Sequence, residues 1–416
     1  MVLSLERYIR KKMENNFIKT NKYKTINLYL YYTCPYDLKR RLCFNILSYF
    51  IGDYSYAYPT KEAMTSIKDN LYGADVYCGA KIKANLLTFN IKYSFVNPRF
   101  LNDIEEKEFI DFFKEFLYNV YFSEELLEEF KLIYKDTIKR SLDKPNNYAN
   151  NRINQIIGSY DSLFAVYDID NIDKIDSITL DDVKETYKYL LNECGVNTYL
   201  IGDYSNELYN YVKTLDKGNP YRLINKKIDI NEISEIVEDK NVSQSSLQVL
   251  FKSPYSRNDK EFYAYMLGNA VFGIVPTSLL FDEVREKLSL CYYISVVDYL
   301  NEGLVKVYTA IEGKNKDLVL EQINIQLQRM IHKDYDPIKI DLARSLIIDS
   351  ITSLQDNIDA YCGYLYSNEI NDVVCTRQEY IANLNKVTID DISNVFKKYK
   401  HVLTYMLNGV KDEKDS

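Results

Sequence analysis

LYLYYTCPYDLKRRLCFNIL, residues 28–47, is an apolar and aromatic run that reaches Pro35 and passes into a segment with helical spacing. LQVLFKSPYSRNDKEFYAYML, residues 247–267, follows the same order, and Pro254 stands in the place of Pro35. Further pairs of similar segments keep nearly the same offset, at 66–77 with 283–294 and at 86–93 with 304–311. This repetition predicts two copies of one structural unit within the chain.

Each copy combines strand-like and helix-like segments. TINLYLYYTC at 25–34 is apolar and β-branched or aromatic, which is typical of a strand, and residues 38–51 place apolar side chains on one helical face. A hairpin is expected at 76–95, further helices at 61–73, at 104–122, from Ser123 onward and at 179–191, and another strand at 197–205. Because strands and helices are segregated rather than strictly alternating, we predict an α+β fold of two homologous halves, each a mostly antiparallel sheet packed with helices.

The boundary between the halves is expected in residues 206–242, which are rich in Lys, Asn, Asp and Glu and show weak periodicity. Such a segment favours a linker followed by an entering strand. We therefore place an N-terminal half at 1–215 and a C-terminal half at 216–416.

The overall charge and hydropathy exclude some partners. The chain has 416 residues, with 52 Lys and Arg against 60 Asp and Glu, so its net charge of −8 repels phosphate backbones. Its first residues never reach the roughly seven consecutive apolar residues of a signal peptide, and no later stretch approaches the roughly 18 of a membrane span. We expect a soluble, cytoplasmic protein whose partners include neither nucleic acid nor a membrane.

Histidine and cysteine usage restricts the chemistry. The chain has two histidines, His332 and His401, although zinc sites and general-base catalysis depend heavily on imidazole. An odd number of cysteines without a CxxC pair argues against a disulfide framework and a thiolate zinc site, so we expect reduced, mostly buried thiols. A cysteine nucleophile is a weaker alternative, because it needs a base and both histidines are distant in sequence.

GNAVFGIVPTSLLFDEVREKLSLCYYIS, residues 268–295, resembles the signature of the C-terminal half of pitrilysin/insulinase-family metallopeptidases. With the duplication and FIKTNKYKTINLYL at 17–30, the resemblance covers nearly the whole chain. It is strongest to short bacterial non-peptidase members, the EF-P 5-aminopentanol modification-associated proteins. The resemblance implies a fold like that of insulinase and the mitochondrial processing peptidases, in which two such halves close around a peptide. In active members the first half carries an inverted zinc motif, HxxEH, on a helix.

The helix that corresponds to this motif lacks the zinc-binding residues. In HxxEH, two histidines on one helical face hold zinc, and the glutamate activates the bound water. The matching positions are Asn45, Ser48 and Tyr49, none of which is a credible ligand or base in that geometry. We expect an ordinary helix in which Tyr49 packs and the other two hydrogen-bond locally, with no metal or other cofactor in this chain.

The family's distal glutamate ligand corresponds to Glu129. If the alignment is shifted by one residue, it corresponds to Glu128 instead. A lone carboxylate does not hold zinc. A solvated helix face beside Lys131 and Lys135 is therefore the favoured interpretation, and Glu129 is a degenerate zinc-site position.

Arg285 and Tyr292 match a pair that active relatives keep in the second half. The resemblance implies that both side chains bind substrate, because a guanidinium and a phenol each donate to a carbonyl oxygen that gains negative charge. Alternatively, Arg285 pairs with Asp282 and Tyr292 packs in a strand. Ser289 stands where relatives usually have glycine, and Tyr293 should point to the opposite sheet face from Tyr292.

The apolar turn VFGIVPTSLLF, residues 271–281, leads into the segment that carries Arg285. It is shaped by Gly273 and Pro276, and Thr277 or Ser278 caps the helix that follows. Such a turn could line a peptide groove, but a buried connection is the favoured interpretation.

Together these residues predict a non-catalytic subunit of a heterodimeric zinc-dependent peptidase. A homologous partner would contribute HxxEH and its zinc, while this chain would contribute Arg285, Tyr292 and half of the peptide chamber. Alone, the chain would be proteolytically inactive. The alternative is a stand-alone protein that binds an extended peptide, for instance at a sheet edge, without cleaving it. Homodimers stay open as well, because duplicated halves present related faces.

Overall fold

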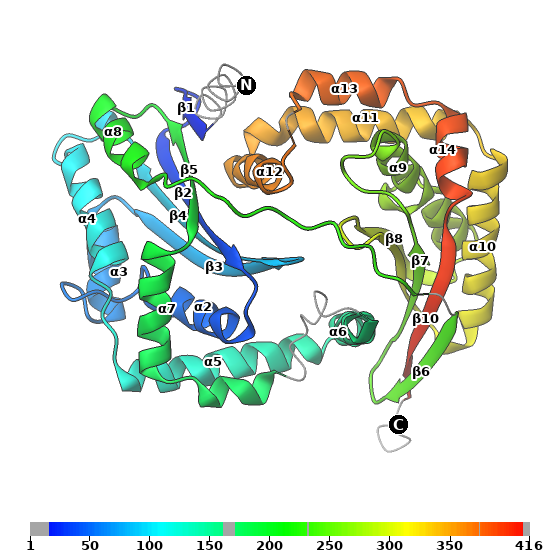
Figure 1. Cartoon of the computed structure of the whole chain (residues 1–416), viewed down its shortest axis with the longest axis horizontal. Helices are drawn as coiled ribbons and strands as arrows, with labels where there is room; N and C mark the ends of the chain where they lie inside the picture. Colours follow the sequence, from blue (N-terminus) through cyan, green and yellow to red (C-terminus); the bar gives the residue numbers. More distant parts are fainter. Residues whose placement is uncertain (1–15, 161–170, 231–232, 374, 411–416) are drawn as a thin grey trace. The chain divides into compact units, whose positions relative to one another are not determined.

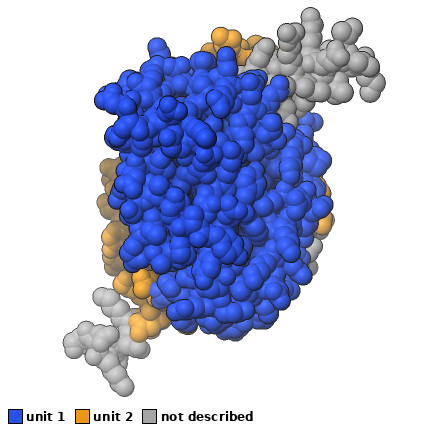
Figure 2. All heavy atoms as spheres, turned by 90° about the vertical axis from the view of Figure 1, so that its left-hand side faces the viewer, with its two compact units in different colours: residues 1–137, 171–223, 357–372 blue, residues 138–170, 224–356, 373–416 orange. Residues whose placement is uncertain are grey.

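The computed structural model describes residues 16–160, 171–230, 233–373 and 375–410. They form two compact units, which are shown in different colours in Figure 2. The first unit takes its described residues from 1–137, 171–223 and 357–372, and the second from 138–170, 224–356 and 373–416.

The first unit is built on a five-stranded sheet with the order β1-β5-β2-β4-β3 (Figure 1). Neighbouring strands are antiparallel except for β1 and β5, which are parallel. The strands are β1 (Phe17–Lys19), β2 (Thr25–Pro35), β3 (Asp75–Lys83), β4 (Leu86–Val96) and β5 (Gly195–Gly202). The helices are α2 (Leu38–Phe50), α3 (Lys61–Asn70), α4 (Glu106–Tyr118), α7 (Leu180–Asn192), α8 (Asn206–Leu215) and α12 (Ile358–Ile370), with 3-10 turns η1 (Pro98–Phe100) and η3 (Ile172–Ser177). α5 (Glu124–Leu142) begins in this unit and ends in residues of the second.

The second unit contains a five-stranded sheet with the order β6-β10-β7-β9-β8, in which β6 and β10 are parallel and the other neighbours antiparallel. The strands are β6 (Ser234–Lys240), β7 (Ser245–Lys252), β8 (Cys291–Tyr299), β9 (Leu304–Ile311) and β10 (Lys400–Gly409). The helices are α6 (Pro145–Tyr160), α9 (Phe262–Asn269), α10 (Lys316–His332), α11 (Ile338–Ser353), α13 (Arg377–Asn385) and α14 (Ile389–Phe396). Two π-helical segments, η4 (Ala270–Ile274) and η5 (Phe281–Lys287), and two 3-10 turns, η6 (Gly313–Asn315) and η7 (Leu354–Asp356), complete it. Within the described residues, no helix is both long and apolar enough to cross a membrane.

The two sheets have the same topology. Each strand of the second sheet holds the place of the strand five numbers earlier in the first, including the parallel pair at one edge and the antiparallel hairpin at the other. This confirms the predicted α+β fold of two homologous halves, each with a mostly antiparallel sheet.

One helix from each half of the sequence packs in the unit formed mainly by the other half. The sequence did not indicate this exchange. α6 precedes the boundary expected at 215/216, yet it packs on the second sheet. Figure 1 shows α6 on the opposite face of that sheet from α10. The buried apolar face of α6 consists of Ala149, Ile153 and Ile157. The Glu238 carboxylate on β6 holds the helix further, because it accepts from the Tyr148 hydroxyl at 2.5 Å and from Arg152 Nε at 2.9 Å.

In return, α12 packs on the first sheet. The Tyr366 hydroxyl shares hydrogen bonds with Thr33 on β2 at 2.8 Å and with Thr88 on β4 at 2.7 Å. The Tyr29 hydroxyl donates to Asp359 at 2.7 Å. The buried apolar members of this contact are Tyr29, Leu86, Tyr199, Ile201, Cys362, Tyr366 and Ile370. The exchange of two helices means that each unit depends on both halves of the sequence.

Local sequence signals explain most of the boundaries. Thr179 caps α7, the helix expected at 179–191, through a capping box with Asp182. Ser123 accepts from the backbone N–H of Leu126 at the start of α5. The expectation of a linker directly after β5 was wrong, because α8 occupies 206–215. The sequence contains a short indication of this helix, since Leu208 and Val212 lie four residues apart, the spacing of one helical face, and both are buried.

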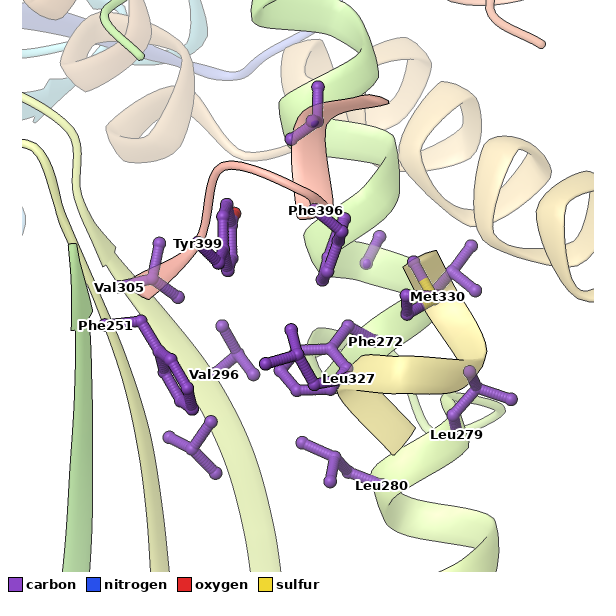
Figure 3. Packing of buried hydrophobic residues seen from close by; sticks show 14 of the residues in the cluster. Phe251, Phe272, Leu279, Leu280, Val296, Val305, Leu327, Met330, Phe396 and Tyr399 are labelled. Carbon is purple, nitrogen blue, oxygen red and sulfur yellow. The ribbon is translucent and has the colours of Figure 1, made fainter. Parts of the chain in front are cut away.

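The turn at 271–281 lies in the core of the second unit (Figure 3). Phe272 and Leu280 are fully buried, and Gly273 leaves no room for a side chain because a Cβ there would lie 2.4 Å from Val296 Cγ2. Ser278, rather than Thr277, provides the cap, as its Oγ accepts from the Phe281 backbone N–H at 3.4 Å. The favoured interpretation as a buried connection is therefore confirmed for residues 271–273 and 278–280, whereas Ile274, which is 42% exposed, and Pro276 lie at the surface.

Candidate functional site

The three motif positions of α2 form ordinary helix contacts. Asn45 Nδ2 donates to the Arg41 carbonyl oxygen at 3.1 Å and to the Tyr134 hydroxyl at 2.8 Å. Ser48 Oγ donates to the Asn45 carbonyl oxygen at 2.6 Å. The Tyr49 ring lies against Phe130 with centroids 5.4 Å apart. An amide, a hydroxyl bonded to its own helix and a packed phenol do not fit a zinc ion, which prefers imidazole, thiolate and carboxylate.

The two acidic candidates of α5, Glu128 and Glu129, form ion pairs with lysines. Glu129 is half exposed and lies 3.9 Å from Lys61 Nζ of α3, while Glu128 accepts from Lys131 Nζ at 2.7 Å. Both contacts are those of a solvated helix face, and neither carboxylate is recorded in contact with Asn45, Ser48 or Tyr49. Across the described residues, no group of three or more His, Cys, Asp and Glu side chains could hold a metal ion.

The side chain of α5 that faces Asn45 is Tyr134, which sequence reasoning missed. A signal was available, because Leu127, Phe130 and Tyr134 follow one another at helical spacing and all three are buried. A phenol thus occupies the space beside the first motif position.

Tyr134→Phe tests this contact. The substitution removes one hydrogen bond to a partly buried amide and keeps the packed ring, so the free energy of unfolding should fall by about 1 kcal/mol. Urea unfolding monitored by circular dichroism measures the change. Tyr56→Phe is the matched control, because Tyr56 is 72% exposed and should shift stability by less than about 0.5 kcal/mol. Equal effects of the two variants would contradict the proposed contact.

Arg285 and Tyr292 are brought together in the second unit. Arg285 Nε donates to the Tyr292 carbonyl oxygen at 3.0 Å, and Nη1 donates to Glu286 at 2.9 Å. The guanidinium also lies over the Phe281 ring, 4.7 Å from its centroid. These contacts fix the orientation of Arg285 and leave Nη2 without a recorded partner among the described residues.

Tyr292 lies at a bulge in β8, the outermost strand of its sheet. The pairing with β9 shifts between Cys291 and Tyr293, and a bulge of this kind re-aims a side chain. The Tyr292 side chain is 62% exposed. Tyr293 is half-buried, and burial raises its pKa to about 12. The two neighbouring phenols therefore have different environments.

The alternative interpretation of this pair was wrong. Asp282 forms its ion pair with Lys339 of α11, not with Arg285, and Tyr292 is not packed in the sheet. Ser289, between the two residues, has φ +51°, a left-handed conformation in which glycine is favoured. The backbone of this turn thus keeps a conformation typical of glycine although the residue is serine.

The histidines provide no base for a cysteine nucleophile. His401 Nε2 shares a hydrogen bond with Thr404 at 2.9 Å, and its ring packs near Phe251. Burial lowers the pKa of His401. His332 is exposed at the end of α10, and neither ring is recorded in contact with a cysteine within the described part of the chain.

Comparisons with known proteins agree with this geometry. Residues 177–346 match the family model described as the peptidase M16 inactive domain. Over 408 residues, covering 95% of both chains, the sequence is 25% identical to the probable inactive metalloprotease YmfF of Bacillus subtilis. Over residues 177–346 the chain is thus similar to the inactive domain of M16 peptidases.

Solved structures extend the similarity to nearly the whole chain. A conserved protein from Enterococcus faecalis V583 superposes with a TM-score of 0.86 at 26% identity, covering 96% of each chain. A peptidase M16 inactive domain from Pseudomonas fluorescens has the same fold, with a TM-score of 0.75, 16% identity and 96% coverage of each chain. The matched family model and the B. subtilis relative are both described as inactive, and α2 of this chain lacks HxxEH.

Proposed function

We propose that this chain is the non-catalytic subunit of a heterodimeric zinc-dependent peptidase, in which it provides Arg285 and Tyr292 and half of the peptide chamber. The observation that carries the proposal is the contrast between the two units. The motif positions of α2 are absorbed into packing and local hydrogen bonds, whereas Arg285 is oriented by a backbone carbonyl and Tyr292 is largely exposed. A guanidinium oriented by its own segment beside an exposed phenol suits contact with a second molecule.

The chemistry of the pair suits a peptide substrate. The Arg285 guanidinium and the Tyr292 hydroxyl are donors, and a peptide carbonyl oxygen becomes more negative as the bond is attacked. A partner with HxxEH would supply the zinc and the general base. This chain's own task would be to orient the substrate carbonyl and to stabilise the charge on its oxygen.

Substitutions in the assembled complex test this role. With an HxxEH-bearing homologue as partner, Arg285→Ala and Tyr292→Phe should each reduce kcat/KM for a peptide substrate about 10²- to 10³-fold, the loss typical of one such donor. Lys287→Ala is the matched control, since Lys287 is 65% exposed on the same segment and pairs only with nearby Glu283 in the described structure. Full activity of the Arg285 and Tyr292 variants in an intact complex would exclude the proposed role.

A stand-alone peptide-binding protein is the second candidate, and the sheet edges favour it. β3 and β8 each pair on one side only, so the outer backbone groups of both face no other strand of the described structure, although the Tyr292 carbonyl oxygen of β8 accepts from Arg285. Titration of unstructured peptides into the isolated chain separates the two candidates. Micromolar binding without a partner supports this second function, and no binding supports the first. Size-exclusion chromatography of the same sample tells whether the chain forms a homodimer.

A further inference from the structure

Two cysteines of the first unit lie directly opposite each other at one end of its sheet. The register of β2 and β5 ends with Thr33 opposite Gly195. Cys194 is the residue directly before β5, and continuing the same antiparallel register by one step beyond Gly195 places Cys34 opposite Cys194. Each thiol affects the pKa of the other.

The backbone hydrogen bonds identify the kind of pair. The Cys194 N–H donates to the Tyr189 carbonyl oxygen of α7, and the Val196 N–H donates to the Gly218 carbonyl oxygen, so both point away from β2. On the other strand, the Tyr36 N–H donates toward β4, to the Asn85 carbonyl oxygen. Because bonding direction alternates along a strand, Cys34 and Cys194 form a non-hydrogen-bonded pair. In such pairs the Cα atoms are about 4.5 Å apart, within the range that a disulfide spans.

The charges near the pair favour ionisation of Cys34 over Cys194, whereas burial limits the access of an oxidant to both thiols. Both residues are buried, Cys34 completely and Cys194 to all but 4%. The Cys194 thiol and the nearby Arg40 guanidinium lower the pKa of Cys34, while burial and the Asp37 carboxylate oppose them; the Cys34 thiol and burial raise the pKa of Cys194. Arg40 stands in the first turn of α2, next to the N-cap Asp37. A thiol near a cation and a helix N-terminus ionises more readily.

We propose that Cys34 and Cys194 are a redox-modification site that forms a reversible cross-strand disulfide when the protein meets a hydroperoxide. The Cys34 thiolate attacks one peroxide oxygen, the O–O bond breaks, and a sulfenic acid and one water form. The Cys194 sulfur then attacks the Cys34 sulfur, the S–O bond breaks, and a second water leaves. Overall, two thiols lose two electrons and two protons, and one hydrogen peroxide becomes two waters.

The bond would join the strand that leads into α2 to the strand that follows α7. It would close a loop of most of the first unit, and a disulfide that closes a long loop restricts the unfolded chain strongly. The oxidised protein should therefore unfold at a temperature several degrees higher than the reduced protein. Neither Arg285 nor Tyr292 takes part in this reaction. The redox proposal can therefore be tested independently of the proposed peptidase role.

Peptide mapping of the full chain tests the proposal. The reduced protein is treated with hydrogen peroxide, denatured, alkylated with iodoacetamide and digested. The expected result is a Cys34–Cys194 linked peptide and a protein mass lower by two hydrogens, both reversed by dithiothreitol. If both cysteines are instead recovered alkylated, or linked to other cysteines, the proposal is overturned.

Single variants sharpen the assignment. Cys34→Ser and Cys194→Ser should each abolish the linked peptide and the rise in unfolding temperature. Cys43→Ser is the matched control, because Cys43 is also fully buried in the first unit, burial raises its pKa to about 11, and its recorded interactions include no cysteine among the described residues. Loss of the linkage in Cys43→Ser would contradict the assignment. If a variant fails to fold, peptide mapping of the unsubstituted protein still shows whether Cys34 and Cys194 form the disulfide.

Discussion

Lys306→Met should increase the free energy of unfolding at pH 7 by about 2 to 4 kcal/mol. Lys306 lies on β9 in the second unit and is only 3% exposed. Its Nζ donates to the uncharged Asn150 side chain of α6 at 2.6 Å, and the Tyr299 and Tyr308 rings lie within 6 Å. No carboxylate is recorded as its partner within the described residues. A buried ammonium without a counter-charge opposes folding, and a methionine of similar length removes that penalty.

The pH dependence of stability identifies the cause. Burial lowers the pKa of Lys306 from 10.5 to about 7 in the folded chain. Between these values the unfolded chain binds more protons than the folded chain, so stability increases as the pH rises. The penalty is complete below pH 7 and disappears toward pH 10.5. From pH 7 to pH 9 the unsubstituted protein should gain about 2 kcal/mol relative to Lys306→Met.

Urea unfolding of both proteins at several pH values measures this difference. Comparing the two proteins cancels the titration of cysteines and tyrosines, which they share. Lys260→Met is the matched control, because the Lys260 side chain is 89% exposed and its loss should change stability by less than about 0.5 kcal/mol at every pH. A Lys306→Met variant that is less stable at pH 7, or that shows no relative pH dependence, would contradict this account of the α6 contact.

Phe272→Ala should reduce the free energy of unfolding by about 3 to 5 kcal/mol. Phe272 has no exposed surface and packs against Phe396 of α14, with ring centroids 5.4 Å apart (Figure 3). Removing the ring leaves a cavity that its neighbours fill only in part. The expected loss is large because η4 lies between the sheet and the helices of the second unit.

Ile274→Ala provides the control for this prediction within the same turn. Ile274 is 42% exposed, so its truncation should cost less than about 1 kcal/mol. Thermal unfolding with urea titration as a second measurement gives both values. If the two substitutions had similar effects, the stretch at 271–281 would not be the buried connection that we describe.

The sequence predicts the repeated fold well because the signals are local and occur twice. The apolar runs of β2 and β7, each followed by a proline and a helix, fix the matching order of both sheets. The exchange of α6 and α12 could not be predicted in this way. Which sheet covers an amphipathic helix depends on long-range contacts, such as Tyr366 with Thr33, that leave no periodic signal in the chain.

The candidate site was predictable in part. The absence of histidine near α2 follows directly from the sequence, and so does the spacing of Arg285 and Tyr292. The bulge at Tyr292 and the pairing of Asp282 with Lys339 were not predictable, because a one-residue shift between strands and a contact across 57 residues depend on tertiary packing. Likewise, the Cys34–Cys194 pair becomes evident only from the register of β2 with β5.

The most direct test of the central claim is peptide hydrolysis by an HxxEH-bearing homologue with and without this chain. The account predicts that the isolated chain hydrolyses no peptide even with added zinc, and that mixing raises kcat/KM well above that of the homologue alone. Hydrolysis by the isolated chain, or a mixture no more active than the homologue by itself, would contradict it.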